Sequence, residues 1–74
     1  MNNSREIIIA IDAMGGDYGP STIIKAAFLA SKKLSKIKFI FFGEKKKITP
    51  LLEKNKILNI SEVVNTEQII TNDT

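Results

Sequence analysis

The sequence predicts an α/β protein in which three strands and two helices alternate in the order β-α-β-α-β, with the strands in one parallel sheet. Residues 7–11 and 37–42 are continuous apolar runs without alternation, as is typical of parallel strands covered on both faces. Between these runs the apolar residues recur at spacings of three and four, which indicates a helix. Two strands joined by a helix pair in parallel with a right-handed crossover in nearly all known proteins.

The first strand leads into a glycine-rich turn, which reads Asp-Ala-Met-Gly-Gly-Asp-Tyr-Gly-Pro over residues 12–20. A strand, a glycine turn and a helix start bring unpaired backbone N–H groups and the positive end of a helix dipole together, which favours an anion. Gly15, Gly16 and Gly19 lack the spacing of a dinucleotide-binding loop, and no Gly-Lys-Ser/Thr of a Walker A loop follows. The residues alone leave two interpretations open, an anion-binding loop and a purely structural turn.

The first helix is expected over residues 21–35, with Pro20 at its first position, where the φ angle of proline already suits a helix. Lys25, Lys32 and Lys36 fall on one side of this helix. The opposite, apolar side predicts packing against the sheet. Its residues recur at helical spacing and are Ile23, Ile24, Ala27, Phe28, Ala30 and Leu34.

The remaining elements follow the same alternation. A second helix is expected over residues 46–55 with Pro50 near its first turn, and a third strand over residues 60–65. Parallel strands end at one edge of a sheet, so the Asp12 turn and Gly43-Glu44 are expected to meet there. Two crossover helices cannot cover both faces of three strands. Residues 1–74 are therefore expected to be the first, incomplete portion of one doubly wound domain.

The amino-acid composition excludes several classes of functional site. The chain contains no cysteine and no histidine, which excludes disulfides, thiolate or imidazole metal ligands and a histidine base within it. The net charge is +3, but 13 isoleucines, 10 lysines and 6 asparagines are what A+T-rich codons favour, so no nucleic-acid partner is expected. No cofactor or metal is expected either. The apolar run at 7–11 is shorter than a signal sequence of ~7–15 residues or a membrane span of ~20, so a cytoplasmic location is expected.

Two carboxylates flank the turn and are the first candidates for a site. Asp12, directly at the strand end, is interpreted as a site residue, and Asp17 as a cap of the loop or of the helix. Met14 and Tyr18 are expected to pack. The aromatic residues of the second strand are expected in the core, and the lysine run is expected at a solvated helix start; these residues are Phe39, Phe41, Phe42, Lys45, Lys46 and Lys47.

The stretch at residues 9–20, Ile-Ala-Ile-Asp-Ala-Met-Gly-Gly-Asp-Tyr-Gly-Pro, closely resembles the opening of the bacterial phosphate acyltransferases of the PlsX type, the fatty acid/phospholipid synthesis proteins. The similarity continues through Phe-Gly-Glu at 42–44, Ile-Thr-Pro-Leu-Leu at 48–52 and Glu-Gln-Ile-Ile at 67–70, and so covers essentially the whole chain. Members of this family are several times longer. The resemblance therefore identifies the chain as an N-terminal fragment, which is expected to be inactive and poorly folded on its own.

The resemblance implies transfer of an acyl group from acyl-carrier protein to inorganic phosphate, which gives acyl phosphate for phospholipid synthesis. It also implies a fold like that of isocitrate and isopropylmalate dehydrogenases, a homodimer, and peripheral membrane association through a portion outside this chain. Carried over residue by residue, the motif makes Asp12, Gly15, Gly16 and Asp17 the substrate- or phosphate-binding residues, with no individual catalytic roles assigned. Two alternatives stay open: a stand-alone phosphate- or nucleotide-binding α/β module, and a non-functional gene remnant.

Overall fold

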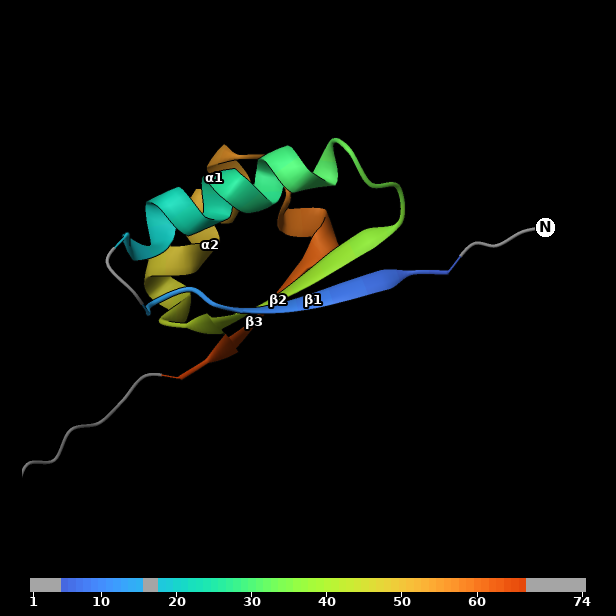
Figure 1. Cartoon of the computed structure of the whole chain (residues 1–74). Helices are drawn as coiled ribbons and strands as arrows, with labels where there is room; N and C mark the ends of the chain where they lie inside the picture. Colours follow the sequence, from blue (N-terminus) through green and yellow to red (C-terminus); the bar gives the residue numbers. More distant parts are fainter. Residues whose placement is uncertain (1–4, 16–17, 67–74) are drawn as a thin grey trace, which may run out of the picture.

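The computed structural model describes residues 5–15 and 18–66 and shows one sheet with two helices (Figure 1). The elements follow in the order β1, α1, β2, α2, a 3₁₀ turn and β3. This order confirms the predicted alternation of strands and helices. The bounds are β1 Ile7–Asp12, α1 Gly19–Ser31, β2 Ile37–Gly43, α2 Lys45–Lys54, the 3₁₀ turn Leu58–Ile60 and β3 Ser61–Asn65.

The three strands form a parallel sheet in the order β1-β2-β3. Ile9 lies opposite Phe39, and Phe39 lies opposite Ser61, so side chains at odd-numbered positions share one face. Both helices cover this same face (Figure 1). The α/β class and the parallel sheet are therefore as predicted, with one layer of helices on the sheet.

The core lies between the helices and the odd-numbered face of the sheet. β2 alternates between buried odd positions and more exposed even positions, and the rings of Phe39 and Phe41 stack with their centroids 5.6 Å apart. The helices contribute mainly through Ile24 on α1 and Leu52 on α2, both fully buried. The buried apolar residues are Ala13, Ile24, Ala27, Ile37, Phe39, Phe41, Ile48, Leu52 and Ile57.

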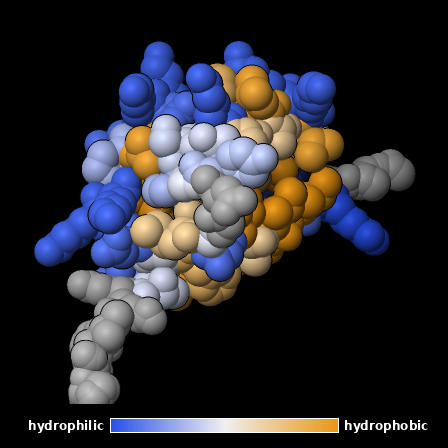
Figure 2. Space-filling model, turned by 60° about the vertical axis from the view of Figure 1, so that its left-hand side comes forward, coloured by the Kyte–Doolittle hydropathy of each residue, from blue (hydrophilic) through white to orange (hydrophobic). Residues whose placement is uncertain are grey.

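The even-numbered face of the sheet is open, which confirms the expectation that two crossover helices cannot cover both faces of three strands. Ile8 is 58% exposed, Phe42 is 37% exposed and Val64 is 38% exposed. In Figure 2 apolar surface runs along the right and lower sides, while hydrophilic side chains crowd the helical side at the top. The physical reason is that β1-α1-β2 and β2-α2-β3 place both helices on the same side, which leaves nothing in the described chain to cover the other.

The first helix is shorter than predicted. It ends at Ser31, whose hydroxyl donates a 2.6 Å hydrogen bond to the carbonyl of Phe28, a local bond that competes with continuation of a helix. Leu34 therefore lies beyond the helix and is 40% exposed, although its spacing placed it on the apolar face. Lys36 has a left-handed φ of 57°, and its carbonyl accepts a hydrogen bond from the N–H of Ile7 at the start of β1.

The second helix contains Pro50 as its sixth residue, which corrects the expectation that this proline lies near the first turn. A proline here leaves the carbonyl of Lys46 without its helical donor and brings the ring close to it. Both residues are exposed, so water can satisfy that carbonyl and the cost is reduced. The third strand begins at Ser61 rather than Ile60, because Ile60 closes the preceding 3₁₀ turn.

At the end of α2, Lys56 adopts a left-handed backbone conformation that favours glycine. Lys56 has a φ of 61°, its N–H bonds to the carbonyl of Glu53 and the N–H of Ile57 bonds to that of Leu52, which is the Schellman pattern that usually carries glycine. Lys56→Gly is expected to stabilise the protein by about 1 kcal/mol, because glycine has no side chain to clash in this conformation. Urea unfolding of both proteins measures the difference, and Lys54→Gly inside the helix is the control, expected to destabilise. Equal stability of Lys56→Gly and the wild type would contradict the prediction.

Candidate functional site

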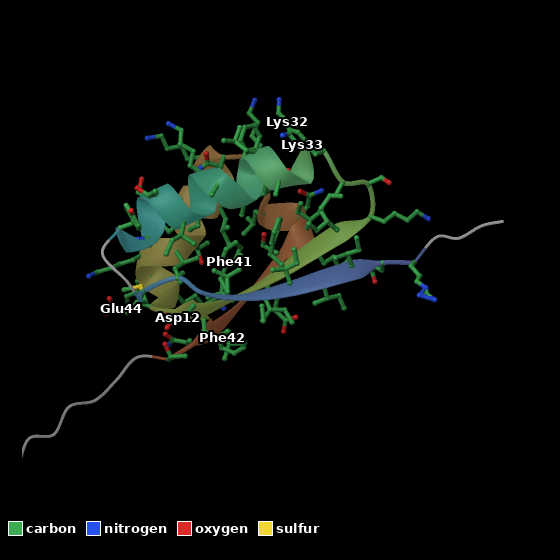
Figure 3. All side chains as sticks on the ribbon, viewed as in Figure 1. Asp12, Lys32, Lys33, Phe41, Phe42 and Glu44 are labelled. Carbon is green, nitrogen blue, oxygen red and sulfur yellow. The ribbon has the colours of Figure 1, made fainter. Side chains whose placement is uncertain are left out.

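The carboxyl ends of all three strands meet at one edge of the sheet, where both helices begin. The N–H of Ala13 bonds to the carbonyl of Phe42 at 2.9 Å, which holds the end of β1 against β2. The N–H of Lys45 bonds to Oδ1 of Asn65 at 3.2 Å, which connects the start of α2 to the end of β3. The predicted meeting of the Asp12 turn with Gly43-Glu44 is confirmed, and Figure 3 shows Asp12 and Glu44 at this edge.

Asp12 organises the turn that follows β1. Its Oδ1 atom accepts a 3.0 Å hydrogen bond from the N–H of Met14, two residues on, as aspartate commonly does in turns. A Cβ atom on Gly15 would lie 2.9 Å from Oδ2 of Asp12, so any side chain at residue 15 would require the Asp12 carboxylate to shift. The structure thus places two predicted site residues in contact. Their role toward a ligand stays a prediction.

Asp12 also belongs to the open face of the sheet. It pairs with Phe42, which pairs with Val64, so the three residues form the last row of even-numbered positions. The Asp12 side chain is exposed, and so are those of its two row partners. A carboxylate therefore stands at the end of an apolar surface, on the side of the sheet away from the helices.

Both helices have their N-termini at this edge. The residues that precede the helices, Tyr18 before α1 and Glu44 before α2, do not cap them through their side chains, and neither first turn contains an acidic residue. The α1 helix begins at Gly19, which has a φ of 79°, and Pro20 is its second residue rather than its first. The Glu44 carboxylate before α2 pairs with Lys47 at 3.1 Å. The positive ends of two helix dipoles thus lie at the edge of the sheet where β1 ends at Asp12.

Some of the packing predictions for this edge are confirmed, and others are wrong. Met14 is half-buried against the core, as predicted, whereas Tyr18 is 75% exposed and the packing predicted for it is wrong. Phe39 and Phe41 are buried as predicted, but Phe42 points to the open face. The lysine run is exposed at a helix start, as predicted: Lys45, Lys46 and Lys47. Gly16 and Asp17 lie outside the described residues.

The sequence placed Gly43 at this edge but did not indicate its close packing, and it did not indicate Asn65 at all. Gly43 is buried in close contact with Met14 and Ile48, and its only sequence signal was its place at the end of an apolar run. Asn65, which accepts the Lys45 N–H through its side chain, carried no signal because the two residues are 20 positions apart. Their importance arises from strand pairing, which places the ends of β2 and β3 next to one another.

The sequence of this chain is similar to those of known proteins. The model of a family described as fatty acid synthesis protein matches residues 7–74. A phosphate acyltransferase of Parvibaculum lavamentivorans is 43% identical over 65 residues, which are 86% of this chain and 18% of the relative. A phosphate acyltransferase of Nitratiruptor sp. is 45% identical over 65 residues, which cover 88% of this chain and 19% of the relative.

A third relative, the phosphate acyltransferase of Aster yellows witches'-broom phytoplasma, is 41% identical over 58 residues, 78% of this chain and 16% of the relative. The chain thus spans less than a fifth of the length of these three proteins. The matched part includes every described strand and helix as well as the Asp12 turn. Because the family model matches 7–74 of the 74 residues, the chain belongs to the fatty acid synthesis protein family.

Proposed function

We propose that this chain forms one wall of the active site of a phosphate acyltransferase, which transfers an acyl group from acyl-carrier protein to inorganic phosphate. The observation that carries the proposal is the Asp12 turn. It lies at the carboxyl edge of a parallel sheet, next to the start of α1, within the segment shared with relatives that are named phosphate acyltransferases. Residues 1–74 are then part of a single α/β domain that is completed by further polypeptide.

For this reaction the protein must position the phosphate and stabilise the charge that develops at the thioester carbonyl. A phosphate oxygen attacks the thioester carbonyl carbon, the carbon–sulfur bond breaks, the carrier thiolate leaves and takes up a proton, and an acyl phosphate results. Phosphate is itself the nucleophile, so its placement against the face of the carbonyl carbon is the main task. Backbone N–H groups at the start of α1 suit that task, because they attract an oxyanion.

Asp12 has a distinct place in this proposal. A carboxylate repels the negative phosphate, but it accepts a hydrogen bond from a protonated phosphate oxygen. Oδ1 is engaged by the Met14 N–H, and the Asp12 side chain is exposed, so Oδ2 is the oxygen for such a bond. Removal of that proton as the oxygen attacks would make the phosphate a better nucleophile. Gly15 and Gly16 supply close backbone approach, and Asp17 caps the loop or helix.

The partners proposed for this function are acyl-carrier protein and phosphate, in the cytoplasm. Homodimerisation and peripheral membrane association are proposed for the longer family proteins, through segments other than the one matched here. Neither helix that the structure describes is long and apolar enough to cross a bilayer. The isolated chain is proposed to be inactive, because one wall of a site does not enclose a substrate.

A chimera tests the proposal. The matched segment of the Parvibaculum lavamentivorans relative is replaced by the corresponding residues of this chain, and acyl phosphate formation from acyl-carrier protein and phosphate is measured. We expect activity in the chimera and none in the 74-residue chain alone. Lys33→Ala, just beyond the end of α1 that is farther from the turn (Figure 3), is the control and is expected to leave activity unchanged. A folded but inactive chimera would refute the proposal.

The alternatives make different predictions in the same system. A stand-alone binding module would show phosphate-dependent shifts of the Gly15 amide in the 74-residue chain although the chimera is inactive. A non-functional remnant would show neither binding nor activity, even when the relative lacking its matched segment is supplied separately. Acyl phosphate formed after mixing these two polypeptides would exclude the remnant.

A further inference from the structure

Gly43 is buried between the turn after β1 and the start of α2. A Cβ atom at this position would lie 2.6 Å from Cγ and 3.1 Å from Sδ of Met14, and 2.7 Å from Cδ1 of Ile48. Carbon atoms in favourable contact are about 3.5–4.0 Å apart. Any side chain at residue 43 would therefore force Met14 or Ile48 to move.

The two neighbours differ in their freedom to move. Ile48 is fully buried in the core with Phe41 and Leu52, and close packing there resists displacement. Met14 is half-buried, unbranched and flexible, and it lies in a turn. A side chain at residue 43 would therefore displace Met14 and its turn rather than Ile48 and the core.

Movement of Met14 would not stay local. Its N–H is held by Oδ1 of Asp12, and Gly15 follows it directly and passes close to the same carboxylate. We propose that Gly43 is a positioning residue for the Asp12 turn: because it has no side chain, Met14 can lie over the end of β2, and this placement sets the orientation of the Asp12 carboxylate and the path of Gly15. The inference rests on the proposed function for the identity of the ligand, and on the geometry for the positioning.

Three substitutions separate positioning of the turn from packing of the core. Gly43→Ala introduces the clash. Met14→Ala, added to it, removes Cγ and Sδ, whereas Ile48→Val, added instead, removes Cδ1, so each second change relieves one of the two close contacts. The KM for phosphate and kcat are measured in the chimera, and the Gly15 amide resonance is followed in the 74-residue chain and in the chimera. Met14→Ala and Ile48→Val alone provide the reference values.

We expect Gly43→Ala to raise the KM for phosphate on the order of 10- to 100-fold, since small misplacements of a binding group have effects of this size, and to change kcat less. The Gly15 amide resonance is expected to move as well. When Met14→Ala is added to Gly43→Ala, the KM for phosphate and the Gly15 resonance should return to the values of the Met14→Ala single variant. Addition of Ile48→Val should not restore either quantity.

Rescue by Ile48→Val without rescue by Met14→Ala would overturn the inference, because it would show that the core is what the glycine protects. An unchanged KM and an unchanged Gly15 resonance in Gly43→Ala would overturn it as well. A wild-type chimera without acyl phosphate formation would instead defeat the proposed function. In that case the shift of the Gly15 resonance, and its reversal by Met14→Ala, still decide whether Gly43 positions the turn.

Discussion

Replacing Phe41 with alanine is expected to abolish any cooperative unfolding transition of the 74-residue chain and to lower the Tm of the chimera. Phe41 is fully buried at the centre of β2, between the helices and the sheet. Loss of a buried phenylalanine costs about 3–5 kcal/mol, because a cavity remains. A domain of this size has a total stability of only about 4–11 kcal/mol at the usual stability per residue. Urea unfolding followed by circular dichroism is the measurement.

Phe42 is the matched control for Phe41, because it is the same residue type, one position further along the same strand. Its side chain is 37% exposed on the open face, so Phe42→Ala is expected to cost about 1 kcal/mol or less in the isolated chain. In the chimera the cost is expected to rise, since the remaining polypeptide is expected to cover this face. Equal losses for the two substitutions in the isolated chain would contradict the one-sided core.

Replacing Asp12 is expected to produce the largest loss of activity. Asp12→Asn keeps an oxygen to accept the Met14 N–H, so the turn is retained while the charge is removed. If the carboxylate receives a proton from phosphate, acyl phosphate formation by the chimera should fall about 100-fold or more. Asp12→Ala should lose this activity too, and should in addition lower the free energy of unfolding by about 1 kcal/mol through loss of the hydrogen bond.

The control for Asp12 is Glu53→Gln, which removes an exposed carboxylate near the far end of α2. It is expected to change neither the Tm nor the rate of acyl phosphate formation. Asp12→Asn with wild-type activity would show that Asp12 serves the turn alone. Comparing kcat with the KM for phosphate then separates proton transfer from binding, because a residue that only binds phosphate changes the KM more than kcat.

Local patterns predicted most of the fold because they depend on neighbouring residues. The apolar runs placed β1 and β2, helical spacing placed α1, and the alternation of elements placed α2, with both helices within a few positions of their observed bounds. The errors arose where local and long-range demands differ. Leu34 has helical spacing but follows the Ser31 hydroxyl bond that accompanies the helix end, and Pro50 lies inside α2 because its exposed side tolerates a missing hydrogen bond.

The candidate site was predictable only in part. Asp12 and Gly15 stand out because an aspartate and a glycine-rich turn follow directly after an apolar strand, and the structure brings the two into contact. The exposure of Tyr18 and the close approach of Gly43 to Met14 could not be predicted in this way. Both depend on how the turn lies against another strand and helix, and no residue in the turn specifies that arrangement by itself.

The sequence by itself determined the order of the elements, the position of the turn and the family to which the chain belongs, because periodicity and a distinctive motif are local properties. The tertiary structure decided which face of the sheet is buried, that Asp12 belongs to the open face, and that residue 43 has no room for a side chain. These features arise from the pairing of strands far apart in the sequence and from the placement of both helices on one side. Each joins residues that no local pattern relates.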